Sequence, residues 1–98
     1  MTIEKTITGT AAVLKTIGRL DTITSPQLDA VIDDCIAGLE DLVFDFSELE
    51  YVSSAGLRVL LKAQKQMEAQ GSMKLIHVNE TILEILDITG FYDILTVE

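Results

Sequence analysis

The apolar positions divide the chain into alternating strands and helices. Residues 3–8 alternate between apolar and polar positions, as in a half-exposed strand, and residues 12–17 form a second strand pattern. The turn at Gly9-Thr10 between them is short, which predicts an antiparallel hairpin. Residues 18–21 are expected to end the second strand.

A first helix is predicted after this hairpin. Ser25 is a suitable N-cap residue, and Pro26 suits the first helical position. Gly38 marks the expected end of the helix. The apolar residues between these points follow helical spacing and form one face: Leu28, Val31, Ile32, Cys35, Ile36 and Leu39.

The middle of the chain predicts a buried strand, a loop and a long helix. Residues 42–46 are apolar except for Asp45, as in a central strand of a parallel sheet. Residues 47–53 are expected to form a loop. A second helix is predicted from residue 54 to residue 70, where Gly71 stops it.

The C-terminal part predicts one more strand and one more helix. Residues 73–78 form the strand pattern, and residues 94–97 could add a short last strand. Asn79 is expected to cap the helix and Gly90 to close it. The apolar positions of this helix are Ile82, Leu83, Ile85, Leu86 and Ile88.

A hairpin followed by helix–strand alternation predicts an α/β fold in one domain covering residues 1–98. The sheet should be mixed: an N-terminal antiparallel hairpin, then parallel strands joined by right-handed crossovers. Amphipathic helices should pack on it. Because only three such helices are available, one sheet face is expected to be covered less well than the other.

Composition and charge narrow the function classes. No apolar run approaches the ~20 residues of a membrane span, and the start of the chain lacks the pattern of a secretory signal, which favours a cytoplasmic protein. The single cysteine, Cys35, falls on a helical apolar face and is expected to pack there. The net charge of −9 argues against partners made of nucleic acid or anionic lipid. It could steer the chain to a basic protein partner, or serve solubility alone.

The sequence offers little for catalysis. It contains no Walker loop, dinucleotide fingerprint or calcium loop, and its single cysteine excludes a cysteine-rich metal site, so neither a cofactor nor a metal is expected. His77 is the only histidine and lacks a catalytic constellation. The chain is therefore not expected to be an enzyme.

The most informative segment joins the buried strand to the long helix. In parallel sheets, functional sites usually lie just beyond the carboxyl ends of the strands. Ser54 lies at or next to the predicted helix N-cap, where its hydroxyl could simply accept a hydrogen bond from the amide of Gly56 or Leu57. However, Gly56 is a poor helix former in the first turn, and Ser53 adds a second serine where one cap would suffice.

One segment resembles the signature of the STAS family, in particular the bacterial anti-sigma factor antagonists. It reads Val52-Ser53-Ser54-Ala55-Gly56-Leu57-Arg58-Val59-Leu60-Leu61. In that family a serine lies two residues before the glycine, and here that serine is Ser54. Three further segments resemble family features in the same order: Gly18-Arg19-Leu20-Asp21, Asp45-Phe46-Ser47 and Thr89-Gly90-Phe91. Several family members have aspartate before the phosphorylated serine and serine or threonine after it, whereas this chain has Ser53 and Ala55.

The resemblance implies a partner-switching regulator of a sigma factor. Its partner would be an anti-sigma factor that is also a serine kinase using ATP and magnesium. The unmodified chain would bind the kinase and free the sigma factor, phosphorylation of Ser54 would end the complex, and a serine phosphatase would reset it. Ser53 is a less favoured acceptor. The expected partner-binding residues are Asp21, Ser53, Ala55, Gly56, Leu57, Arg58 and Lys62.

The same sequence allows other interpretations. Arg58, Lys62 and Lys65 follow each other on one flank of the helix and could bind an acidic partner, or pair with Glu68 or Glu50. Asp21 and Asp45 could lie near Ser54 or only solubilise their turns. As a whole, the chain could instead be a non-phosphorylated STAS subunit of a transport complex, or a nucleotide-sensing STAS module.

Overall fold

The computed structural model describes residues 1–98. It contains a five-stranded sheet in which four strands follow the order β1-β2-β3-β5, while β4 pairs with the C-terminal end of β2. Only β1 and β2 are antiparallel, and the other pairs are parallel. The mixed sheet expected from the sequence is thereby confirmed. The strands are β1 (Thr2–Thr8), β2 (Ala11–Leu20), β3 (Asp41–Asp45), β4 (Leu49–Val52) and β5 (Ser72–Ile76).

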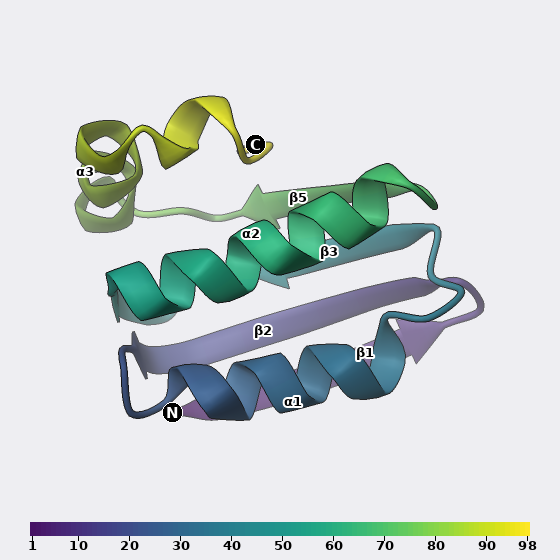
Figure 1. The fold of residues 1–98 in the computed structure, drawn as a ribbon. Coiled ribbons are helices and arrows are strands. Elements are labelled where there is room, and N and C mark those ends of the chain that lie inside the picture. Colours follow the sequence, from purple (N-terminus) through teal and green to yellow (C-terminus); the bar gives the residue numbers. More distant parts are fainter.

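Two long helices lie side by side across one face of the sheet, as Figure 1 shows. They are α1 (Ser25–Cys35) and α2 (Ser54–Glu68). The third helix, α3 (Glu80–Thr89), lies at the end of the sheet beside β4, and the short 3₁₀ turn η1 (Phe91–Asp93) follows it (Figure 1). None of these helices combines the length and apolar composition that a bilayer-spanning segment requires.

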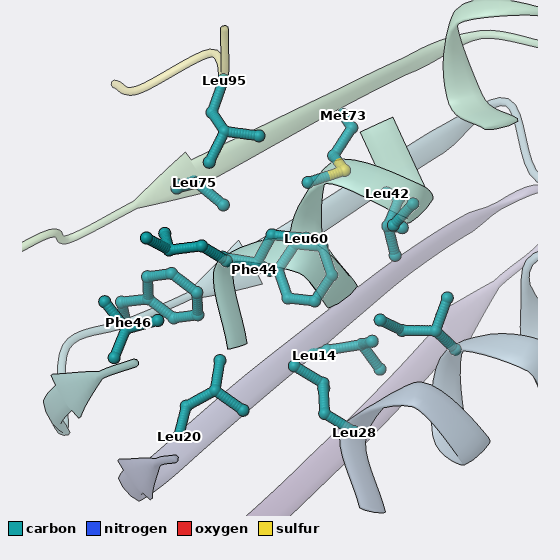
Figure 2. Packing of buried hydrophobic residues seen from close by; sticks show 14 of the residues in the cluster. Leu14, Leu20, Leu28, Leu42, Phe44, Phe46, Leu60, Met73, Leu75 and Leu95 are labelled. Atoms are coloured by element: carbon teal, nitrogen blue, oxygen red, sulfur yellow. The ribbon is translucent and has the colours of Figure 1, made fainter. Parts of the chain in front are cut away.

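The core fills the space between this sheet face and the helices. The strand register aligns Leu14, Phe44 and Leu75 across β2, β3 and β5, so that all three point to the same side. Each is fully buried. Figure 2 shows Leu28 of α1 and Leu60 of α2 meeting these strand residues from the helix layer. Burying one such side chain contributes about 1.5–3 kcal/mol, so this layer is the main source of stability.

The opposite sheet face is less covered, as the sequence predicts. The same register places Val13, Val43 and Lys74 in one row on that face, where Val13 is exposed and the other two are half-buried. The next row contains Lys15 and Asp45, and Lys15 Nζ lies 2.7 Å from a carboxylate oxygen of Glu48. This face is therefore a mixture of charged and aliphatic side chains.

Two predictions of secondary structure are wrong. The expected loop at residues 47–53 contains β4, whose pairing partner lies in β2 and is not visible in the local sequence. The expected strand at residues 94–97 is reduced to one isolated bridge between Val97 and Leu75.

Two predictions about single helix residues are also wrong. Ser25 is the first residue of α1 rather than its cap, because its hydroxyl donates to the carbonyl of Asp21 and Thr24 occupies the cap position. Ile88 points away from the core, with 85% of its surface exposed.

Candidate functional site

The junction between β4 and α2 lies at the carboxyl end of the parallel strands. β4 ends at Val52, Ser53 forms the connection, and α2 starts at Ser54. The amide of Ser53 donates to the carbonyl of Leu20 at 2.8 Å, which fixes the start of α2 to the end of β2. The sheet thus holds this helix start in a defined position.

The two serines at this junction have different roles. Ser53 is the N-cap of α2: its backbone is extended, and its Oγ accepts a hydrogen bond from the amide of Gly56 at 3.3 Å. Ser54 is the first helical residue and is exposed to solvent. The possibility that Ser54 itself caps the helix is therefore wrong. Its hydroxyl makes no hydrogen bond within the chain and is accessible to a second molecule.

Gly56 serves packing inside the chain. A methyl group on Gly56 would lie 2.7 Å from Cγ of Leu20 and 3.0 Å from Cγ2 of Val52. The missing side chain therefore lets α2 approach β2 and β4 closely. Gly56 and Leu57 are both buried in the core, and their contact with a partner stays a prediction. The helical face that opens to solvent begins with Ser54 and Ala55 instead.

The turn between β2 and α1 lies at the same end of the sheet. Asp21 accepts hydrogen bonds from the amides of Thr24 and Ile23, each at 3.0 Å. The hydroxyl of Thr24 donates to the carbonyl of Arg19 at 2.7 Å and completes the turn. The hydrogen bond from the amide of Thr24, supported by that from the amide of Ile23, lowers the pKa of the Asp21 carboxyl. Asp21 therefore orders the turn as an anion.

Ile23 is the feature that sequence reasoning missed at this end of the molecule. Its side chain is 89% exposed, although the backbone around it is fixed by the hydrogen bonds of Asp21. Only the position of Ile23 between two polar residues, Thr22 and Thr24, could have indicated exposure. Ser54 starts α2 and Ile23 lies in the turn that follows β2, and the hydrogen bond from Ser53 to Leu20 joins these two segments.

The three basic residues of α2 divide into two groups. Arg58 and Lys65 are exposed and form no salt bridge, and Arg58 lies one helical turn after Ser54. Lys62 bridges to α1, with its Nζ 3.1 Å from Asp29 and 3.5 Å from Asp33. The hydrogen bond to Asp29 and the nearby carboxylates raise the pKa of Lys62. Lys62 thus joins the two helices and does not pair with Glu68 or Glu50.

Asp45 belongs to a different part of the surface from Ser54. Its side chain accepts a hydrogen bond from the amide of Ser47 at 2.9 Å and lies on the open sheet face, in the row of Lys15. Partial burial opposes ionisation, but the hydrogen bonds from Ser47 outweigh it and lower the pKa of Asp45. Of the two aspartates considered from the sequence, only Asp21 adjoins the start of α2.

Comparison with known proteins identifies relatives of this chain. The profile of the STAS domain family matches residues 2–98. BtrV of Bordetella bronchiseptica, named as an anti-sigma factor antagonist, is 34% identical over 82 residues, which cover 82% of this chain and 71% of BtrV. The anti-sigma-B factor antagonist of Bacillus subtilis is 30% identical over 81 residues, covering 82% of this chain and 74% of that protein.

The fold also matches solved structures. The Bacillus cell fate determinant SpoIIAA in its phosphorylated form superposes with a TM-score of 0.76 at 20% identity, over 99% of this chain and 91% of SpoIIAA. The unphosphorylated form gives a TM-score of 0.77 at 19% identity, over 99% of this chain and 87% of that chain. At this identity the likeness shows the shared fold.

Proposed function

The chain belongs to the STAS domain family, and we propose that it is an anti-sigma factor antagonist. In this proposal the unphosphorylated chain binds an anti-sigma factor and thereby releases a sigma factor. Both sequence relatives reported above carry the name of this role. The chain acts as a regulatory binding protein and as the acceptor of a phosphate, and performs no catalysis itself.

The finer part of the proposal is that the anti-sigma factor is a serine kinase that phosphorylates Ser54. One observation carries it: Ser53 caps α2, which leaves the neighbouring hydroxyl of Ser54 exposed and without a partner. Phosphoryl transfer requires an accessible hydroxyl that can align with the γ-phosphate, while nucleotide, metal and base come from the kinase. A serine phosphatase would remove the phosphate and restore binding.

The position of Ser54 explains how a phosphate could block binding without unfolding the chain. The first amides of a helix have no carbonyl partners, and the helix dipole favours negative charge at this end. A phosphate of about −1.5 to −2 charges is therefore tolerated there by the isolated chain. In the complex the same charge would lie in the interface, where its desolvation and repulsion weaken docking.

The proposed docking surface consists of the exposed residues around this hydroxyl. Arg58 supplies a positive charge one turn along α2, and Ala55 adds a half-buried side chain beside Ser54. Ile23 supplies an aliphatic contact from the turn that Asp21 orders. Asp21 acts here by positioning the turn. Lys62 is engaged with α1 and is assigned to the stability of the helix pair.

The nucleotide-sensing alternative receives less support from the surface. The largest cavity, of about 480 Å³, is lined by eight residues that include Glu48 and Glu50 but no lysine or arginine. Carboxylates repel phosphate groups, so this cavity is unsuited to ATP or GTP. Calorimetric titration with either nucleotide tests this alternative directly, since it requires binding without a kinase.

Affinity capture from the native cell lysate tests the proposed function. Wild type, Ser54→Ala and Ser54→Asp serve as baits, with and without added ATP. We expect the wild type to retain a kinase until ATP is added, Ser54→Ala to retain it throughout, and Ser54→Asp to retain less, because one carboxylate carries less charge than a phosphate. Capture of transporter subunits by all three baits alike would favour the transport-complex alternative.

Mass mapping of the ATP-treated wild type completes this test. The phosphate should be found on Ser54, and Ser53→Ala should be phosphorylated as the wild type is. A phosphate on Ser53 would contradict the assignment of the acceptor.

A further inference from the structure

The exposed apolar side chains of this protein are unevenly distributed. Single exposed hydrophobic residues are normal on protein surfaces, whereas a cluster indicates a contact site. Three of the six large exposed hydrophobic residues lie within one segment of seven residues: Ile88 at 85% exposure, and Tyr92 and Ile94 at 48% each. This segment includes the end of α3 and the turn η1, apart from α1 and α2 in Figure 1.

The helix α3 has an inner and an outer face. Ile82 and Leu86, four residues apart, are buried against the rest of the chain. Leu83, Glu84, Asp87 and Ile88 share the outer face, because residues three and four apart are neighbours on a helix. The chain then turns at Gly90, whose φ of 80° ends the helix in the left-handed conformation.

This turn brings η1 back beside the outer face and creates a groove. Leu83, Glu84, Asp87 and Tyr92 line a cavity of about 300 Å³. Leu83 and Tyr92 make its apolar lining, while Glu84 and Asp87 place two carboxylates at its side. We name these four residues the α3 groove; Ile88 lies beside it on the outer face of α3. None of them belongs to the docking surface around Ser54.

The charge of this region selects the kind of ligand. Residues 79–98 contain five acidic residues and no lysine, arginine or histidine. Neither Glu84 nor Asp87 takes part in a salt bridge. Anionic lipids and nucleic acids are repelled by such a surface, whereas a basic protein segment is attracted to it.

We infer that the α3 groove is a docking site for a basic segment of a protein partner. In this complex an aliphatic side chain of the segment lies between Tyr92 and Leu83, and Ile88 extends the apolar contact beside the groove. Flanking lysine or arginine side chains pair with Glu84 and Asp87. The site is separate from the acceptor serine, so its occupation does not depend on the phosphorylation of Ser54.

Nuclear magnetic resonance with a synthetic probe tests this inference on the full chain. The probe is a short amphipathic peptide of leucine and lysine, added to the ¹⁵N-labelled protein. We expect amide shifts concentrated in residues 83–94 and binding that weakens with salt, because charged pairs are screened. A control peptide with serine in place of leucine should bind at least about tenfold more weakly, since it lacks the aliphatic anchor.

Two variants provide a matched control. Tyr92→Ser removes a side chain that lines the groove, and Ile7→Ser removes an equally exposed one, 48% in both cases, in β1 outside it. Because both side chains are exposed, both variants should fold. Tyr92→Ser should weaken peptide binding at least about fivefold, and Ile7→Ser should leave it unchanged. Equal effects of the two variants, or shifts spread over the whole acidic surface, would overturn the inference.

Discussion

Replacing Ser53 should lower the stability of the chain and leave phosphorylation intact. Replacing Ser54 should leave the stability unchanged and abolish phosphorylation. An N-cap serine typically contributes about 0.5–2 kcal/mol. The bond from the amide of Gly56 to Ser53 measures 3.3 Å, longer than the usual value of about 2.9–3.0 Å, which places it in the lower half of that range. We therefore expect Ser53→Ala to lower the free energy of unfolding by about 0.5–1 kcal/mol.

Ser54→Ala should have almost no effect on stability. The Ser54 side chain is exposed and makes no hydrogen bond, and surface substitutions of this kind usually change the free energy by less than about 0.5 kcal/mol. Ser53→Asp is the matched control, because aspartate caps a helix about as well as serine. It should restore most of the stability that Ser53→Ala loses.

Thermal and urea unfolding, followed by circular dichroism, measure these differences. A loss of about 0.5–1 kcal/mol corresponds to a decrease in midpoint temperature of about 2–8 °C for a domain of this size. If Ser54→Ala destabilised the chain as much as Ser53→Ala, the division of roles between the two serines would be wrong. The same conclusion would follow if Ser53→Asp were no more stable than Ser53→Ala.

Four further predictions concern the surroundings of the acceptor. Gly56→Ala should lower the free energy of unfolding in urea by about 1–2 kcal/mol, because overpacking against Leu20 outweighs the better helix propensity of alanine; a more stable variant would contradict this. The lowered pKa of Asp21 means that the ionised carboxyl stabilises the fold above its unfolded pKa of about 3.9, and that this contribution is lost as pH falls through the lower folded value. Asp21→Asn should therefore lose less stability than the wild type between pH 4 and pH 2, measured by acid titration, and an identical acid limb would be inconsistent with this role. Lys62→Ala should lower the free energy of unfolding in urea by less than about 1 kcal/mol, since its bridge to α1 is exposed. It should change partner affinity by less than about threefold, and a large loss of affinity would show that Lys62 contacts the partner. Arg58→Ala should weaken kinase binding in calorimetry, mainly at low salt, whereas a salt-independent effect would argue against its electrostatic role.

Much of the fold could be predicted because local signals agreed with the tertiary structure. Asn79 caps the start of α3 and Gly90 ends it, as expected, and the apolar run at β3 marked the centre of the sheet. β4 was missed because it is only four residues long and contains Glu50, and because its pairing with β2 is a long-range contact. Such contacts stabilise a strand that is too short to be recognised from its own sequence.

The sequence predicted where the candidate site lies, but not the separate roles of its two serines. A helix boundary is uncertain by one or two residues from sequence, and that uncertainty is enough to exchange the roles of Ser53 and Ser54. The function of Gly56 was also ambiguous, because a missing side chain can accommodate a partner or the protein's own core. Only the positions of Leu20 and Val52 identify the core as the neighbour.

The most direct measurement compares two forms of the chain that differ by one phosphate. Phosphoserine can be incorporated at position 54 during synthesis, and the affinity of the captured kinase for both forms can then be determined by calorimetry. We predict binding at least about 100-fold weaker for the phosphorylated form, equivalent to about 2.7 kcal/mol, with an unfolding midpoint close to that of the unmodified chain. Equal affinities, or a phosphorylated chain that no longer folds, would contradict the account.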